Sequence, residues 1–181
     1  MELVLTGRDC GLKERAPMCG IPYHAAGSYI GRLINKGYKI AICEQLEDPA
    51  LAKGLVKRGI IKLITPGTYT DSTFLEENKN NYIMCLYIDE KNNSALCFAD
   101  ISTGEFDCTD TPFNLSAILD EISKYNPSEI LVQENISTSS LNKIKEIFNG
   151  SVTKLDEGYF SKEGEEILKK QFTNFDPEDY K

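Results

Sequence analysis

The sequence predicts an α/β protein with two parts that differ in charge and in hydrophobic pattern. Residues 1–70 carry ten Lys and Arg against six Asp and Glu, whereas residues 71–181 carry ten against twenty-two. The change in charge coincides with a turn-forming segment, Thr65-Pro66-Gly67-Thr68, and a polar stretch after it. We therefore predict a first domain, a linker and a second domain at residues 1–68, 69–81 and 82–181.

In the first part, apolar residues recur at helical spacing from Ala26 to Ile34, and Gly37 follows as a suitable residue just past a helix end. The β-branched runs 38–43 and 60–65 predict two strands. Between them, Asp48-Pro49 is typical of a helix start and predicts a short helix running towards Gly54. The opening segment 2–6 predicts the end of a further strand.

The second part predicts the element order βββαβαβα. Three strand-like runs on short turns indicate an antiparallel meander, and alternating helical and strand patterns follow, which favour parallel pairing with right-handed crossovers. The strands are expected at 82–88, 95–101, 105–109, 129–133 and 152–155, and the helices at 115–125, 141–148 and from Ser161 onward.

Composition excludes several classes of protein. The chain is 41% hydrophobic and 27% charged, and it has no run of the ~18 apolar residues that a membrane span requires. Glu2 follows Met1 where a secretory signal would begin its basic and apolar segments. We expect a cytoplasmic protein that does not enter a membrane.

The six cysteines form no CxxC pair, and His24 is the single histidine, so the sequence offers no ligand set for a structural zinc ion. Cys85, Cys97 and Cys108 each lie in an apolar, strand-like run and are expected to be buried, reduced thiols. No phosphate-binding loop of the GxxxxGK[ST] type occurs in the chain, which predicts no nucleotide site.

Two carboxylates raise the possibility of a nuclease. Asp89 follows the first strand of the second part, and Asp100 lies near the end of the second strand. Carboxylates at such positions hold Mg²⁺ in ribonuclease-H-like nucleases. Asp89 also belongs to an ordinary hairpin loop, however, and no basic residues gather near either carboxylate. A structural role for both is therefore the stronger interpretation, with the nuclease kept as an alternative.

Basic residues of the first part fall in loops or at the ends of elements, where long cations can reach a phosphate backbone. The same pattern also suits a solvated surface of modest positive charge, and composition alone leaves both interpretations open. These residues are Arg8, Lys13, Arg15, Lys53, Lys57 and Arg58.

Several segments closely resemble the MutS family of DNA mismatch-repair proteins, in order and in spacing. In the first part they are Leu5-Thr6-Gly7-Arg8, Pro17-Met18-Cys19-Gly20-Ile21-Pro22-Tyr23-His24-Ala25, Gly37 to Gln45 with Asp48-Pro49, and Lys57-Arg58 followed by Ile64 to Thr68. In the second part they are Ala99 to Phe106 and Asn126 to Leu131.

The resemblance implies a partial, mixed α/β mismatch-binding domain followed by a ribonuclease-H-like connector domain without nuclease activity. It also implies DNA-backbone contacts at Arg8 and Arg58, with Lys53, Lys57 and the near-DNA loop at Pro17 and Met18 close to them. The implied partners are mismatched duplex DNA and a MutL-like protein, and the implied full-length protein is a homodimer.

The chain departs from the family pattern in ways that set further expectations. The family reads a mismatch with a Phe-x-Glu motif upstream of the segment matching Leu5 to Arg8, and Phe74-Leu75-Glu76 satisfies the pattern only in the linker, as a false match. We expect an internal fragment with an incomplete connector, which is not itself an enzyme and binds no cofactor, because ATP and Mg²⁺ belong to the family's ATPase domain. A protein-interaction module without a DNA role is a further alternative.

Overall fold

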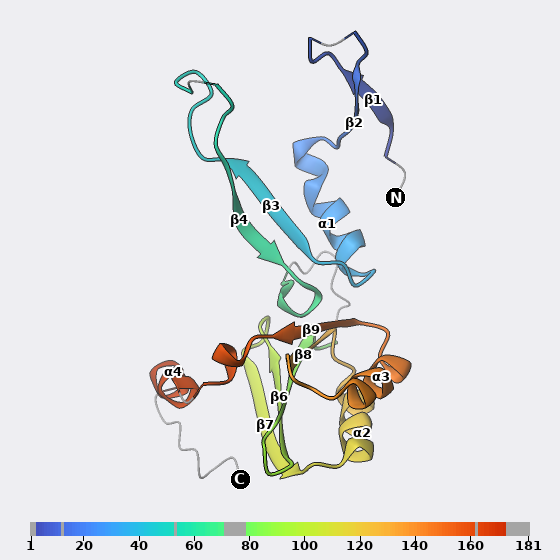
Figure 1. Cartoon of the computed structure of the whole chain (residues 1–181), viewed down its shortest axis with the longest axis vertical. Coiled ribbons are helices and arrows are strands. Elements are labelled where there is room, and N and C mark those ends of the chain that lie inside the picture. Colours follow the sequence, from blue (N-terminus) through green and yellow to red (C-terminus); the bar gives the residue numbers. More distant parts are fainter. Residues whose placement is uncertain (1–2, 12, 53, 71–78, 162, 173–181) are drawn as a thin grey trace.

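The computed structural model describes residues 3–11, 13–52, 54–70, 79–161 and 163–172. Its elements form two bodies, one above the other in Figure 1. The first contains two separate antiparallel hairpins and one helix, and the second contains a five-stranded sheet with helices. None of the helices in the described ranges is both long and apolar enough to cross a membrane.

The first body begins with the hairpin of β1 (Leu5–Arg8) and β2 (Ala16–Cys19). The strand end predicted at 2–6 overlaps β1, whereas β2 was not predicted. The first body continues with the short turn η1 (Tyr23–Ala25) and the helix α1 (Ala26–Ile34). The second hairpin pairs β3 (Ile40–Gln45) with β4 (Arg58–Ile64). Its core is small and consists of Ile34, Ile64 and Tyr69, with Ile30, Ile40 and Ile42 packed at its border.

The short helix expected after Asp48 is wrong. The Asp48 side chain accepts a hydrogen bond from the Ala50 backbone N–H at 2.9 Å, and its carbonyl accepts one from Leu51 at 3.0 Å, which closes a single turn. A single turn fixes several backbone dihedrals for few hydrogen bonds, so it is not extended without packing partners. Leu51 is 80% exposed and supplies no such packing.

The second body has the predicted order βββαβαβα. Its sheet runs β7-β6-β5-β8-β9, with β5, β6 and β7 antiparallel and β5, β8 and β9 parallel. The strands are β5 (Tyr82–Ile88), β6 (Asn93–Asp100), β7 (Glu105–Pro112), β8 (Glu129–Gln133) and β9 (Ser151–Leu155). The helices are α2 (Leu115–Tyr125), α3 (Thr138–Ile147), the short η3 (Glu157–Phe160) and α4 (Glu163–Gln171).

Local chemistry explains where these helices begin and end. The Asn114 side chain accepts hydrogen bonds from the first turn of α2, and Asn126 ends that helix in the left-handed conformation before Pro127. Ser137 caps α3 by accepting a hydrogen bond from the Ser140 N–H at 3.1 Å.

One face of the five-stranded sheet packs against α2 and α3 and forms the main core of the protein (Figure 1). Eleven buried apolar residues meet there, and burying each one contributes about 1.5–3 kcal/mol. They are Met84, Leu86, Leu96, Phe98, Ile118, Ile122, Ile130, Val132, Ile136, Ile144 and Phe148.

The opposite face of the sheet is covered less completely. Phe160 of η3 stacks on Tyr87 with the ring centroids 5.5 Å apart, and Phe172 after α4 stacks on Phe106 at 5.8 Å. The three strand cysteines lie on this face as free thiols, as predicted, but they are partly rather than completely buried. They are only partly buried because this face lacks the layer of helices that covers the other.

Candidate nucleic-acid interface and interdomain junction

The β1–β2 hairpin presents the first group of predicted DNA-contacting residues. Arg8 ends β1 opposite Ala16 and is exposed. Pro17 and Met18 lie on the facing strand, and the Thr6 hydroxyl donates a hydrogen bond to the Met18 carbonyl at 2.9 Å. The structure therefore brings Arg8 onto one hairpin with Pro17 and Met18, which are nine and ten residues away in the chain.

The β3–β4 hairpin presents the second group. Arg58 begins β4 opposite Gln45, and Lys57 precedes it, both with exposed side chains. The Lys57 backbone N–H donates to a Glu47 carboxylate oxygen at 2.6 Å, and the Lys57 carbonyl accepts a hydrogen bond from the Leu46 N–H at 2.9 Å. These contacts fix the backbone and leave the two cationic side chains directed to solvent. Lys53 lies outside the described residues.

Both hairpins extend away from the five-stranded sheet, and their tips lie at the end of the molecule farthest from it (Figure 1). Arg8 lies at the tip end of β1, and Lys57 and Arg58 lie at the tip end of β4. Exposed guanidinium and ammonium groups on two separate tips can each contact a phosphate, and such contacts bind a nucleic-acid backbone without reading its bases.

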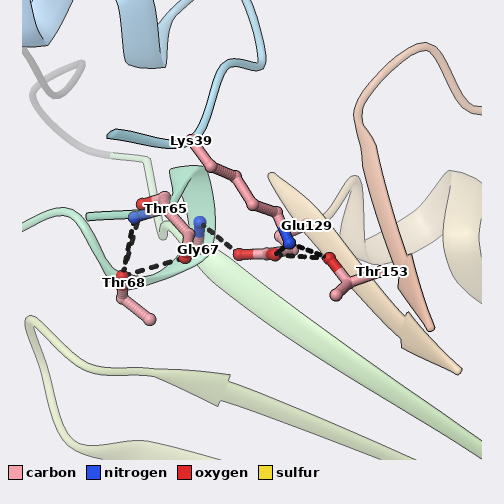
Figure 2. A network of polar contacts seen from close by, with 6 residues as sticks. All are labelled: Lys39, Thr65, Gly67, Thr68, Glu129 and Thr153. Atoms are coloured by element: carbon pink, nitrogen blue, oxygen red, sulfur yellow. Dashed lines mark hydrogen bonds and ion pairs between the residues drawn. The ribbon is translucent and has the colours of Figure 1, made fainter. Parts of the chain in front are cut away.

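A buried carboxylate joins the two domains at the other end of these hairpins. Glu129 begins β8 and is 1% exposed, and Lys39, just before β3, forms an ion pair with its Oε1 at 2.9 Å. The Thr153 hydroxyl of β9 donates to the same oxygen at 2.9 Å, and the Lys39 ammonium also contacts this hydroxyl. Figure 2 shows the Lys39 side chain reaching from the first domain to this pair on the second.

The segment η2 (Pro66–Thr68) completes the junction from above the sheet. The Gly67 N–H donates to the second Glu129 oxygen at 3.4 Å (Figure 2). Thr65 and Thr68 form a capping box that holds η2 in shape, with the Thr65 N–H donating to the Thr68 hydroxyl at 3.1 Å. Both carboxylate oxygens of Glu129 are therefore bonded to donors, as burial of a charge requires.

Opposing effects set the protonation of Glu129. Burial by itself would raise the pKa of Glu129, but hydrogen bonds from Thr65, Lys39 and Thr153 and the positive charge of Lys39 outweigh it, so the pKa lies below its ordinary value. Glu129 is therefore an anion at neutral pH, the charge that its ion pair with Lys39 requires.

The approach of η2 to the sheet depends on Gly67. A Cβ atom at Gly67 would lie 2.8 Å from Ile83 Cβ and 3.1 Å from Glu129 Cβ, so a larger residue could not dock without displacing the backbone. Beside it, the Asn81 amide donates to the carbonyls of Pro66 and Tyr69 at 2.9 and 3.0 Å. Asn81 thus fastens η2 to the beginning of β5.

The path from α1 to Lys39 turns sharply at Gly37, which has φ +78°. Only glycine adopts this left-handed conformation at low cost, and it lets the chain leave the helix and return along β3. Next to this turn, a polar cleft of about 500 Å³ separates the end of α1 from the second domain. Five asparagines are among the residues lining it: Asn35, Asn80, Asn81, Asn126 and Asn149.

The two carboxylates considered for a nuclease do not converge. Asp100 pairs with Tyr82 at the start of β5, whereas Asp89 follows Ile88 at the end of that strand. Six residue steps of a strand place them on the order of 20 Å apart. Within the described ranges there is no group of three or more His, Cys, Asp or Glu side chains that could hold a metal ion. The nuclease alternative is therefore not favoured.

Each of these carboxylates has a structural role instead. Asp89 accepts hydrogen bonds from the Asn93 backbone and side-chain amides at 2.7 and 2.9 Å, which closes the β5–β6 hairpin. Asp100 is 1% exposed and accepts from the Asn81 N–H at 2.9 Å and from the Ser102 hydroxyl at 2.6 Å. Burial would raise the pKa of Asp100, but these hydrogen bonds hold it below its ordinary value.

Sequence reasoning missed the junction residues Glu129, Lys39 and Asn81. A signal for Glu129 was available, because a carboxylate opens a strand that continues Ile130-Leu131-Val132, and a charge in a fully buried strand needs a partner. No comparable signal marked Lys39, whose partners are 90 and 114 residues away.

Together the fold and the exposed basic tips define a two-domain α/β protein with a candidate nucleic-acid interface in its first domain. Comparison with known proteins agrees with that class. The family described as MutS domain I matches residues 1–73, and the family described as MutS domain II matches residues 81–180. The chain therefore belongs to the MutS family of DNA mismatch repair proteins and contains its domains I and II.

Among curated relatives, a protein named DNA mismatch repair protein MutS from Clostridium kluyveri is 69% identical over 99% of this chain. A protein of the same name from Clostridium botulinum strain 657 is 64% identical, also over 99% of this chain. The chain spans 21% and 19% of the lengths of these relatives. The predicted family and fold class are thus confirmed.

Proposed function

We propose that this chain supplies the DNA-backbone grip of a MutS-type mismatch repair protein and transmits the position of that grip to the second domain. The observation that carries the proposal is the placement of Arg8, Lys57 and Arg58, which are exposed at the tips of two hairpins at the end of the molecule far from the five-stranded sheet. The neighbouring Pro17 and Met18, and Lys53 by its place in the sequence, belong to the same proposed surface.

The second domain, in this proposal, is a connector that carries a net negative charge. Its acidic composition suits a protein partner and repels phosphate, so DNA contacts are confined to the first domain. A MutL-like protein is the partner that family membership suggests, and assembly as a homodimer in the cytoplasm is proposed for the full-length protein on the same ground.

A binding titration tests the proposed grip. Fluorescence anisotropy with a paired duplex and with the same duplex carrying one mismatch should give weak binding of equal strength to both, because phosphate contacts do not read bases. The logarithm of the binding constant should fall linearly with the logarithm of salt concentration, with the slope of a few released counterions. Tenfold or greater preference for the mismatch, or binding insensitive to salt, would contradict the proposal.

We further propose that this chain has no catalytic activity or cofactor of its own and that ATP and Mg²⁺ are used elsewhere in the full-length protein. Incubation with Mg²⁺ or Mn²⁺ and labelled DNA or RNA should leave the nucleic acid intact, and ATP should not be hydrolysed. Cleavage that disappears in an Asp89→Asn variant would restore the nuclease alternative. DNA-independent capture of a protein partner, with no DNA binding at any salt concentration, would favour the interaction-module alternative.

A further inference from the structure

Three cysteines stand side by side across the half-covered face of the second domain's sheet. Cys85 on β5 pairs with Cys97 on β6, and Cys97 pairs with Cys108 on β7. The Cys108 S–H points at Cys97 Sγ, and the two sulfur atoms are 3.0 Å apart. All three thiols are free and half-buried.

The two cross-strand pairs differ in backbone geometry. In an antiparallel ladder, opposite residues alternate between hydrogen-bonded and non-hydrogen-bonded pairs, and side chains lie closer in the latter. Pro112 has no N–H and faces Asn93, so that pair is of the non-bonded type, and the Phe113 N–H donates to the Asn92 carbonyl in the adjacent bonded pair. Counting four residues along the ladder from Pro112 makes Cys97 and Cys108 a non-bonded pair.

Between β5 and β6, by contrast, Cys85 and Cys97 form a hydrogen-bonded pair. The Asp89 N–H donates to the Asn93 carbonyl at 2.9 Å, which makes that pair a bonded one. Counting four residues from Asp89 makes Cys85 and Cys97 a bonded pair, in which the α-carbons stand about 5.5 Å apart and the side chains diverge. The Cα separation of a non-bonded pair, about 4.5 Å, lies within the range that a disulfide spans.

We propose that Cys97 and Cys108 are a redox-active dithiol that closes into an intramolecular disulfide by exchange with a small-molecule disulfide such as oxidised glutathione. The Cys97 thiolate attacks one sulfur of the small disulfide and releases one thiolate. The Cys108 sulfur then attacks Cys97 in the mixed disulfide and releases the second. Two electrons pass to the small disulfide, and the two cysteine protons end on its two thiols.

The surroundings of the three thiols assign these roles. The hydrogen bond donated by Cys108 holds the pKa of Cys97 below its ordinary value against the effect of burial, and the thiolate is the attacking form. Burial raises the pKa of Cys85 to about 12, so this thiol stays protonated and inert. The hydrogen bond to Cys97, followed by burial, raises the pKa of Cys108, which reacts once Cys97 has become the electrophile.

Two other uses of these thiols are less compatible with the structure. A soft metal site would need three converging ligands, and the described part of the chain contains no such cluster. Permanent packing of reduced thiols would favour a sealed face, yet Cys97 and Cys108 are only partly buried and β7 is the edge strand. Oxidation would join this edge strand covalently to β6 across the turn at residues 101–104.

Peptide mapping of the intact chain tests the proposal. The chain is incubated with oxidised glutathione, quenched in acid, alkylated in denaturant and digested with trypsin. Cys97 and Cys108 share the tryptic peptide 92–124, whereas Cys85 lies in peptide 80–91. We expect peptide 92–124 to lose two hydrogens and carry no alkyl group, while peptide 80–91 is alkylated. Cleavage after Glu105 should leave its two halves linked until dithiothreitol is added.

Other outcomes would overturn the proposal. These are a link between peptides 80–91 and 92–124, glutathione retained on Cys97 in the unmodified chain, or full alkylation of both cysteines while Cys10, Cys19 or Cys43 is oxidised. A Cys85→Ser variant should form the same disulfide. A Cys108→Ser variant should stop at the mixed disulfide on Cys97. If either variant fails to fold, mapping of the unmodified chain still decides.

Discussion

The two domains differ in how many apolar side chains they bury. Among the residues that the structure describes, the second domain buries eleven apolar side chains between its sheet and two helices, whereas the core of the first consists of Ile34, Ile64 and Tyr69. On β4 of the first domain, Ile60, Ile61 and Leu63 are 64%, 57% and 68% exposed. The second domain can therefore act as a rigid base, and the first holds its shape through short hairpins and through its contact with that base.

Glu129 connects the well-packed second domain to the less well-packed first domain. The carboxylate belongs to the well-packed domain, and its donors include Lys39 and Gly67 from the other. A buried charge with directional partners fixes an orientation more strictly than an apolar contact of equal area, since a shifted donor leaves the charge unpaired. We expect the direction in which the hairpins point to depend on this one group.

The largest expected effect is on native-state hydrogen exchange. Residues 82–88 and 95–101 lie in the interior strands β5 and β6 of the packed sheet. Residues 38–43 include the first part of β3, which pairs with β4 alone in a two-stranded hairpin. Exchange in the two central strands should be slower on the order of a thousandfold, because opening follows local burial. Mass spectrometry of peptic fragments measures it. Equal protection in 38–43 would remove the asymmetry between the domains.

Truncation of a core side chain tests the same asymmetry by stability. Ile130 is fully buried at the centre of the sheet, and Ile130→Ala should lower the free energy of unfolding by about 3 kcal/mol through lost burial and the cavity left behind. The matched change Ile60→Ala on the exposed face of β4 should cost about 0.5 kcal/mol or less. Urea denaturation followed by circular dichroism measures both. Equal costs would contradict the exposed position of Ile60.

Removing the charge at the junction should uncouple the domains. Glu129→Gln keeps the size of the side chain but leaves Lys39 without its counter-ion, and should weaken docking by about 2 kcal/mol. Hydrogen exchange at residues 65–70 should accelerate while 82–88 stays protected. The control Glu134→Gln makes the same charge change at an exposed position just after β8 and should leave both unchanged.

Acid should have the same effect as this substitution, with a defined sign. The pKa of Glu129 is lower in the folded protein than in the unfolded chain. Its contribution is therefore complete above the unfolded pKa, about 4.3 for a glutamate, and is lost as pH falls through the lower folded pKa. Gly67→Ala should open the junction at all pH values, because its clash with Ile83 is steric. Protection at residues 65–70 that is independent of pH in the unmodified chain would exclude Glu129 as the group holding the junction.

How far the sequence predicted this structure depended on how local the signal was. The strand at 129–133 and the helix at 115–125 were predicted at their observed bounds, because the apolar run of the strand and the helical stripe that ends before Pro127 are encoded within each segment. The pairing of β1 with β2 was missed, because β2 is only four residues long and contains Pro17, which is untypical of a strand interior, so only pairing with β1 makes it a strand. The ion pair between Lys39 and Glu129 depends on domain docking and was not predictable from either segment.

The smallest expected effects are those of single cations at the hairpin tips. Arg8→Ala and Arg58→Ala should each weaken binding to duplex DNA by about 1 kcal/mol, equally for paired and mismatched duplexes, and should reduce the salt slope by about one. Lys145→Ala removes the same charge from the exposed surface of α3 in the second domain and is the matched control, expected to change binding little. Anisotropy titrations at several salt concentrations separate these outcomes. Loss of a phosphate contact lowers the affinity and also the slope of the salt dependence. Loss of net charge lowers the affinity by the same amount at any position in the chain. If Lys145→Ala weakened binding as much as Arg8→Ala, the hairpin tips would have no special role, and DNA binding would reflect only the overall charge of the chain.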